Sequence, residues 1–156
     1  MFRGHFEHAI DAKGRTSLPS RFRDLLASGS RRTTSAHGGD LVMTPSPFDP
    51  CLHIFPMKAW EEFEAKIGAL PQFEPNVIRL RRLYVSAAVE CEIDKQGRVL
   101  VPTSLREHAS LQKDVLWAGM GHMVELWARE KWNEVRAITG DEREAFRRAV
   151  AEQLRI

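Results

Sequence analysis

The feature that most constrains the fold of this chain is an internal duplication. The stretch IDAKGRTSLPSRFR (residues 10–23) returns as IDKQGRVLVPTSLR (residues 93–106), with identical Ile, Asp, Gly, Arg, Pro and Arg positions. Downstream, CLHIFPMKAWEEF (51–63) matches MVELWAREKWNEV (123–135), and the separation falls from 83 to 72 positions. A pattern that occurs twice indicates two copies of one module rather than a solenoid.

Both copies predict the same order of elements. An alternating strand ends in Asp-x-x-Gly, which is typical of a hairpin turn. A second short strand leads to Pro19 or Pro102, and each proline begins a short helix because its missing N–H costs nothing in the first turn. Two more strands follow. The predicted strands are 6–10, 16–18, 41–43 and 52–55 in the first copy and 89–93, 99–101, 115–117 and 124–127 in the second.

Helices are predicted to close each copy and to end the chain. The first begins after Pro56 and ends at Gly68, and its counterpart ends before Gly140. The linker LPQFEP leads to an amphipathic stretch, NVIRLRRLYVSAAV. The tail, residues 141–154, has one apolar stripe, which we expect to pack on the core of its own chain; the stripe consists of Ala145, Phe146, Ala149, Val150 and Leu154.

Positive charge gathers at the N-terminal end. The 156-residue chain has a formal net charge of only +2, yet residues 1–32 contain seven Lys or Arg against three Asp or Glu. This distribution favours a surface that faces a polyanion, although an ordinary solvated face fits equally well. Cys51 and Cys91 lie in apolar contexts, and we expect buried free thiols in a reducing compartment. We see no signal peptide or membrane-spanning run, so we expect a cytoplasmic protein.

The repeated turn has the sequence Asp-x-x-Gly-Arg. The Asp side chain can cap its own turn, the Gly supplies positive φ, and the Arg can brace the Asp by a charge-assisted hydrogen bond. We therefore assign these residues a structural role in the turn. They are Asp11 and Gly14 in the first copy and Asp94, Gly97 and Arg98 in the second; the bracing role is weaker for Arg15, because its flanks are polar.

The two turns differ in their surroundings. Arg15 has polar neighbours, with Lys13 before it and Thr-Ser after it. Arg98 begins RVLVP, an apolar run that favours a strand buried on both faces. Glu90 and Glu92 precede it and would repel phosphate. We therefore expect the first turn to be exposed and cationic and the second to be mainly structural.

The sequence lacks the common motifs of enzymes, so we expect that the protein is not an enzyme. The chain has no nucleotide-binding, metalloprotease, Cys-x-x-Cys or nucleophile-elbow motif. His5, Glu7 and His8 could suggest a metal cluster, but on a strand His8 would face away from the other two. We expect no metal, cofactor or small-molecule substrate. A protein-interaction ring, with RLRRLYVSAAV as a partner-binding helix, remains open; RNA binding is a weaker rival, because neither an RNP-type aromatic pattern nor a GXXG clamp is present.

Three stretches carry a resemblance over nearly the whole chain: MFRGHFEHAIDAKGRTSLPSRFRDLL, AVECEIDKQGRVLVPTSLREHASL and GMGHMVELWAREKW. They resemble the MraZ family of bacterial transcriptional regulators, which contain two SpoVT/AbrB-type domains. The resemblance implies a mixed β fold with flanking helices, in which two swapped-hairpin modules form an AbrB-like barrel as an intramolecular pseudo-dimer. It also implies a ring-shaped homo-oligomer that binds repeated promoter elements of double-stranded DNA and represses its own division and cell-wall operon, hence a nucleoid association.

The resemblance also assigns residues and domains. The DNA-reading hairpin of the family is the first, so Arg15 and Lys13 inherit that role, with Arg3 nearby in sequence. The insert SRRTTSAHGGD is longer than expected and leaves the role of Arg31 and Arg32 open. An AbrB-type antitoxin is a further alternative, although such proteins generally have one copy and a disordered tail. We expect a DNA-reading module (5–58), a helical linker (59–87), a structural and assembly module (88–131) and C-terminal helices (132–156).

Overall fold

The computed structural model of the chain describes residues 1–28 and 39–155, so Arg31 and Arg32 lie outside the described residues. All the predicted strands are present, with shifted ends. They are β1 (His5–Ala9), β2 (Arg15–Ser17), β3 (Leu41–Pro45), β4 (Leu52–Pro56), β5 (Val89–Cys91), β6 (Arg98–Leu100), β7 (Asp114–Gly119) and β8 (Val124–Ala128).

Helices occupy the predicted segments. Pro102 and Pro56 are the N-cap residues of α4 and α2, where a missing N–H leaves no intrahelical bond unmade. The amphipathic stretch forms α3 and a continuous π-helical turn, η1. The helices are α1 (Ser20–Ser28), α2 (Met57–Gly68), α3 (Pro75–Leu80), η1 (Arg81–Val85), α4 (Thr103–Ala109), α5 (Arg129–Arg136) and α6 (Gly140–Leu154). Among the described residues, no helix combines the length and the apolar character that crossing a membrane requires.

The two repeats exchange strands. The large sheet has the order β1-β7-β8-β4-β3-β5, so β1 of the first repeat pairs with β7 of the second, and β5 of the second pairs with β3 of the first. β2 and β6 leave this sheet and pair with each other in a two-stranded ribbon. The expected closed barrel is not observed: the large sheet is open, because β1 and β5 remain its edge strands.

The exchange follows an approximate twofold axis. Thr16 lies opposite Val99 in the β2–β6 ribbon, and these residues stand at equivalent places of the two repeats. His53 lies opposite Glu125 in the β4–β8 pair, again at equivalent places. The axis therefore passes through both pairings, and it relates β1–β7 to β5–β3.

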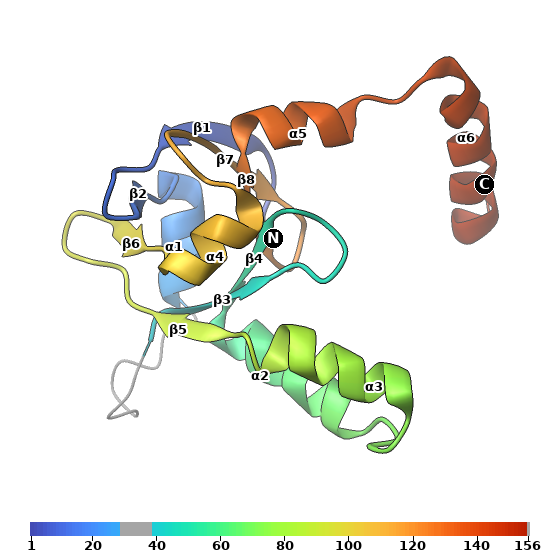
Figure 1. The fold of residues 1–156 in the computed structure, drawn as a ribbon, viewed down its shortest axis with the longest axis horizontal. Helices are drawn as coiled ribbons and strands as arrows, with labels where there is room; N and C mark the ends of the chain where they lie inside the picture. The colour runs from blue at the N-terminus through green and yellow to red at the C-terminus, as the bar shows by residue number, and fades with distance from the viewer. Residues whose placement is uncertain (29–38, 156) are drawn as a thin grey trace.

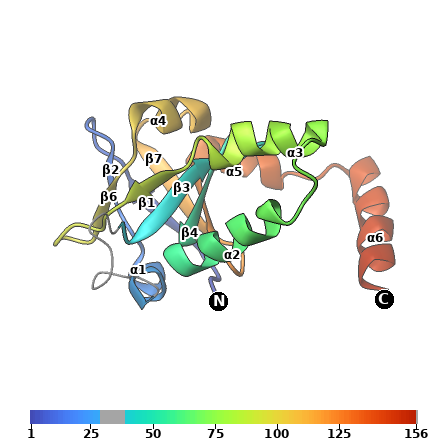
Figure 2. The ribbon, with the colours of Figure 1, turned by 90° about the horizontal axis from the view of Figure 1, so that it is seen from below.

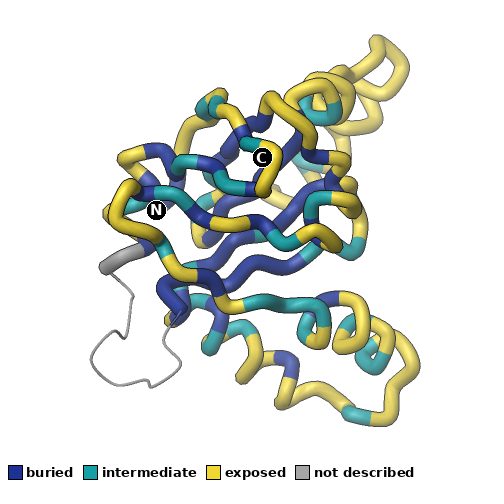
Figure 3. The backbone as a smooth tube through the Cα atoms, turned by 60° about the vertical axis from the view of Figure 1, so that its left-hand side comes forward, coloured by how far each residue is buried: buried dark blue, intermediate teal, exposed yellow. Residues whose placement is uncertain are grey.

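Side chains from both repeats form one hydrophobic core. Leu18, Leu26 and Ile54 of the first repeat pack with Val101 and Trp117 of the second. α1 and α4 lie on opposite sides of the strands (Figure 2). Buried residues concentrate in the strands, whereas the C-terminal helices α5 and α6 are largely exposed (Figure 3). A smaller cluster joins the other face of the sheet to α2 and η1 through Phe55, Trp60 and Tyr84.

α6 does not pack on its own core, so the sequence-based prediction for the tail is wrong. None of its described residues is buried, and Phe146 and Leu154 are 56% and 64% exposed. The reason is that Ala137, which follows α5, is extended (φ −70°, ψ 120°), so the chain leaves the body before α6 begins. Figure 1 shows α6 standing apart from the sheet.

Each Asp-x-x-Gly-Arg turn is locked by the other repeat. The amide of Val101 donates to the Gly14 carbonyl at 2.7 Å, and the amide of Leu18 donates to the Gly97 carbonyl at 3.0 Å. Arg106 of α4 lies beneath the first turn and donates to the carbonyls of Val101 (3.0 Å) and Ala12 (3.4 Å). Arg106, the last identical residue of the repeated stretch, therefore contacts the turn of the other copy.

Arg23 of α1 occupies the equivalent place beneath the second turn. Its Nη2 donates to the Leu18 carbonyl at 3.4 Å, and its guanidinium carbon lies 2.5 Å from where a Cβ on Gly97 would stand. Gly14 and Gly97 have φ of +91° and +76°, a region that L side chains rarely adopt. Both glycines are therefore required by backbone conformation and by close approach.

We predict that Gly14→Ala destabilises the fold more than Gly97→Ala. Both changes force a positive φ on alanine, which costs about 1–2 kcal/mol. At Gly14 the new Cβ would also stand 2.6 Å from the Val101 backbone oxygen, whereas at Gly97 it meets the flexible end of Arg23. Thermal unfolding should show a fall of roughly 2–8 °C for Gly97→Ala and more for Gly14→Ala.

Gly68→Ala is the matched control, because a Cβ there meets nothing within 4 Å and Gly68 lies at the end of α2. Its midpoint should be unchanged or slightly raised. Equal midpoints for all three variants would contradict the interlocked-turn interpretation.

Candidate nucleic-acid interface

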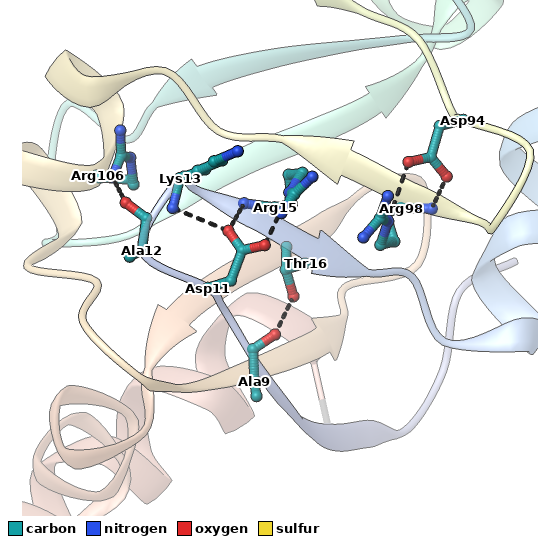
Figure 4. Close-up of polar contacts among 9 residues, drawn as sticks. All are labelled: Ala9, Asp11, Ala12, Lys13, Arg15, Thr16, Asp94, Arg98 and Arg106. Atoms are coloured by element: carbon teal, nitrogen blue, oxygen red, sulfur yellow. Dashed lines mark hydrogen bonds and ion pairs between the residues drawn. The ribbon is translucent and has the colours of Figure 1, made fainter.

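Asp11 organises the first turn. Its Oδ1 accepts hydrogen bonds from the amides of Lys13 (3.0 Å) and Arg15 (2.9 Å), and its Oδ2 forms an ion pair with Arg15 Nε at 2.7 Å. Figure 4 shows these contacts of Asp11 with Lys13 and Arg15. The amide of Gly14 donates to the Asp11 carbonyl and closes the turn. One carboxylate thus fixes both the backbone of the turn and the direction of the arginine.

The second turn repeats these contacts. Asp94 Oδ1 accepts from the amides of Gln96 (2.8 Å) and Arg98 (2.9 Å), and Oδ2 pairs with Arg98 Nε at 3.0 Å. The arginines are also similarly exposed, with 38% for the Arg15 side chain and 31% for Arg98. The geometry of the two Asp–Arg pairs therefore does not distinguish the turns.

Both aspartates are held in the ionised form. The backbone N–H of Arg15, together with its guanidinium and the Lys13 N–H, holds the pKa of Asp11 below its ordinary value. The backbone N–H of Arg98, with its guanidinium and the Gln96 N–H, does the same for the pKa of Asp94. A lowered pKa means that the bracing is present at neutral pH and is lost only as the pH falls through these acidic values.

The β2–β6 ribbon places both arginines on one outward face. Thr16 and Val99 point inward and are buried, and the Thr16 hydroxyl donates to the Ala9 carbonyl at 2.9 Å. The neighbours of these two residues in the strands point outward. The expectation that the second-repeat strand is buried on both faces is wrong, since Leu100 is 55% exposed. The physical reason is that β6 pairs with β2 alone, so no layer covers its outer face.

The other residues assigned from the sequence lie in different places. Lys13 is exposed at the tip of the first turn, beside Arg15. Arg3 is exposed at the opposite end of β1, a strand of five residues that spans roughly 16 Å. The structure therefore brings Lys13 and Arg15 together and leaves Arg3 apart from them. Sequence analysis missed Lys95, which is exposed in the second turn. The presence of one lysine in each of the two repeated turns could have indicated it.

Charge differs between the turns at one nearby position. Glu92, which is exposed, stands where the first repeat has Ala9. Glu7 and Glu90 occupy equivalent places in the two repeats. The charge of Glu7 is neutralised by an ion pair between its Oε1 and Arg129 Nη2, at 3.2 Å. The surroundings of Arg15 are therefore more cationic than those of Arg98.

The ribbon has the features of an anion-binding surface. Its two turns stand at opposite ends of the ribbon, with Arg15 opposite Leu100 and Arg98 opposite Ser17, and the ribbon lies at the end of the molecule away from α6 (Figure 1). They carry Lys13, Arg15, Lys95 and Arg98, and Asp11 and Asp94 fix the two arginines at Nε only. Within the described residues, the terminal nitrogens of Arg15 make no hydrogen bond. Two-stranded ribbons can enter the major groove of DNA, where arginine can donate two hydrogen bonds to guanine.

The sequence of the chain matches one family of known proteins. The sequence model of the family described as "MraZ protein, putative antitoxin-like" matches residues 1–83 and 84–153. Two relatives, each named "Transcriptional regulator MraZ", come from Heliobacterium modesticaldum (42% identical over 86% of this chain and 85% of the relative) and Moorella thermoacetica (40% over 94% of each). A third of that name, from Pseudomonas putida, is 42% identical over 88% of this chain and 86% of its own.

Proposed function

The chain belongs to the MraZ family, and from this membership we propose that it is a sequence-specific DNA-binding transcriptional regulator rather than an enzyme. The observation that carries the proposal is the exposed β2–β6 ribbon with two pre-oriented arginines. The relatives are named as transcriptional regulators, and a ribbon of this kind supplies a surface with which a regulator could read DNA.

Arg15 is the residue that we propose reads bases. Its Nε is committed to Asp11, so the guanidinium is held in one orientation before DNA arrives. Its terminal nitrogens then remain for a guanine edge. Lys13, at the tip of the turn, would contact phosphate and position the ribbon without reading sequence. Arg3 lies too far along β1 to share the contact of Arg15, so we propose it as a separate phosphate contact.

We also propose the architecture, the division into modules and the regulatory role that the MraZ resemblance implies. The strand exchange supports a swapped-hairpin, AbrB-like pseudo-dimer, although the sheet is open. We propose that the first module (5–58) reads DNA, that 59–87 is a helical linker, and that the second module (88–131) and the C-terminal helices (132–156) serve structure and assembly. The protein would act in the cytoplasm at the nucleoid, bind promoter repeats and repress its own division and cell-wall operon.

A second candidate function has one observation in its favour. The matching family is described as antitoxin-like, and α6 presents an apolar stripe without a partner among the described residues. Such a stripe could hold another protein. DNA binding and toxin binding are distinguishable, because the first depends on the ribbon and the second on α6.

We predict that Arg15→Ala erodes the preference for the DNA upstream of the protein's own gene over scrambled DNA. A bidentate contact to guanine discriminates by about 1–3 kcal/mol, so the ratio of the two dissociation constants should fall roughly 5- to 150-fold for each engaged subunit. Fluorescence anisotropy at fixed salt measures both constants, since phosphate contacts make each of them salt-dependent.

Arg98→Ala is the matched control for this experiment. It removes an equivalent ion pair from an equivalent turn, so its structural consequences should equal those of Arg15→Ala. Its effect on discrimination should be smaller, because Glu92 lies beside the second turn. Equal losses of discrimination in two equally stable variants would show that both turns read DNA and would contradict the assignment to the first module.

We predict that Asp11→Asn weakens specific binding even though it removes a negative charge from the interface. The amide oxygen can still accept from the backbone N–H groups, but the Nε of Arg15 loses its carboxylate partner and its orientation. Electrostatics alone would give tighter binding to every duplex. Asp141→Asn, on exposed α6, is the control for net charge. Tighter specific binding by Asp11→Asn would contradict the orienting role of Asp11.

Assembly would raise the affinity of a small reading surface. We propose a closed ring of more than four copies, in which several ribbons engage several DNA repeats and gain from effective concentration. α6 supports this proposal, because Phe146, Val150 and Leu154 recur every four residues on one helix face. Their exposure fits packing against a second copy.

We predict that Phe146→Ser shifts the assembly to smaller species. Removing a phenylalanine that becomes buried between two subunits should weaken the affinity of each subunit contact by about 1.5–3 kcal/mol, roughly 10- to 150-fold. Light scattering coupled to size-exclusion chromatography measures the mass. Arg148→Ser, on the polar side of the same helix, should leave the mass unchanged. A monomeric wild-type protein at micromolar concentration would contradict the ring.

A further inference from the structure

A second group of functional side chains lies where β4 and β8 meet, far from the turns in sequence. His53 and Glu125 stand directly opposite each other in the β4–β8 register, and Cys51 immediately precedes β4. Neighbouring Leu52 and Ile54 point into the main core. His53 instead contacts the rings of Phe55 and Tyr84, on the side of the sheet that α2 and η1 cover.

The three side chains each direct one ligand atom to a common point. Glu125 Oε2 lies 3.8 Å from Cys51 Sγ and 3.5 Å from His53 Nε2, and the three possible ligand atoms lie within 4.8 Å of one another. Cys51 is fully buried, and the side chains of His53 and Glu125 are only 14% and 11% exposed. The group is therefore largely shielded from water but open at one edge.

Neighbouring residues hold the remaining polar atoms of this cluster. The hydroxyl of Tyr84 is hydrogen-bonded to His53 Nδ1, which leaves Nε2 for the common point. Trp127 Nε1 donates to Glu125 Oε1 at 3.0 Å, which leaves Oε2 for the same point. Outer partners of this kind orient the ligands of metal sites. Tyr84 itself comes from η1, and π-helical turns frequently occur at functional sites.

Two of the three separations between the possible ligand atoms are close to those of tetrahedral zinc coordination. With Zn–S near 2.3 Å and Zn–N and Zn–O near 2.1 Å, a tetrahedral ion separates sulfur from oxygen by about 3.6 Å and nitrogen from oxygen by about 3.4 Å. The observed sulfur–oxygen and nitrogen–oxygen separations are 3.8 Å and 3.5 Å. All three atoms lie within 4.8 Å of one another, so Cys51 and His53 would move closer together around the ion. Thiol, imidazole and carboxylate are also the ligand types that Zn²⁺ takes in proteins.

The pKa values of Cys51 and Glu125 indicate how a bound cation would change the protonation of the cluster. Burial raises the pKa of the Cys51 thiol, with a further contribution from the Glu125 charge, so without a cation the thiol keeps its proton. Burial alone would raise the pKa of Glu125, but hydrogen bonds from His53 and Trp127 outweigh it and hold the pKa below its ordinary value. An entering cation would displace the thiol proton to solvent and form the thiolate ligand.

We propose that Cys51, His53 and Glu125 bind one Zn²⁺-class ion, with a water molecule as the fourth ligand. The site departs from the expectation, drawn from His5, Glu7 and His8, that the chain binds no metal. Cys51 and Glu125 are 74 positions apart, so no sequence spacing could have revealed it. The ion would join β4 of the first repeat to β8 of the second and, through Tyr84, to η1.

Metal binding by the full-length protein tests the proposal directly. After equilibration with Zn²⁺ and removal of the free ion, we expect one bound zinc per chain by atomic emission. Co²⁺ should produce a thiolate-to-cobalt charge-transfer absorption. Zinc at about 100 times its dissociation constant should raise the thermal midpoint by roughly 5–10 °C. Glu125→Gln and Cys51→Ser should each lower the affinity at least tenfold.

Cys91→Ser is the matched control, because Cys91 is the other buried free thiol of the described chain and lies outside the cluster. It should keep the zinc and the cobalt absorption. Glu125→Gln is nearly isosteric and decides the outcome should Cys51→Ser not fold, as circular dichroism would show. Substoichiometric zinc on the wild-type protein, or a cobalt absorption that survives in Cys51→Ser, would overturn the proposal. Neither result bears on DNA binding, so the two proposals stand or fall separately.

Discussion

The exchange of strands between the two repeats is the constraint on which the rest of the structure depends. β1 and β5 find their main partners in the opposite repeat, and β2 and β6 form a ribbon with each other. The main core draws on both repeats. Fully burying one Leu or Val side chain contributes roughly 1.5–3 kcal/mol, and here each repeat supplies the surface that buries the other. One repeat alone would expose its core residues and leave strands without ladder partners.

The same exchange creates the candidate DNA surface. Two turns separated by 83 positions in sequence stand at the two ends of one ribbon, and Arg23 and Arg106 each reach beneath the turn of the other repeat. The approximate twofold axis runs through this ribbon and through the His53–Glu125 pair. Residues at the axis meet their own counterparts, so a change in one copy places unlike side chains face to face. The cluster of Cys51, His53 and Glu125 lies at this axis, where His53 faces the unlike Glu125.

The two ends of the chain differ in charge and in packing. The N-terminal repeat has the more cationic turn, with Ala9 where the second repeat has Glu92. The C-terminal end has α6, which contributes no buried residue to the body. In the function proposed here, a weakly cationic ribbon at one end and an apolar helix at the other would let several copies bind DNA at once, because linked weak contacts gain from effective concentration.

The amino-acid sequence by itself determined the duplication, the positions of the strands and the chemistry of the Asp-x-x-Gly-Arg turns. These depend on local rules: alternation, turn residues and proline position. It also pointed to Arg15 and Lys13 as neighbours. Only the tertiary structure decided that Leu100 is exposed, that α6 stands apart, that Arg3 lies away from Arg15, and that Cys51 meets Glu125. Each of these depends on which distant segment covers which face, and strand exchange between repeats leaves no signal in local periodicity.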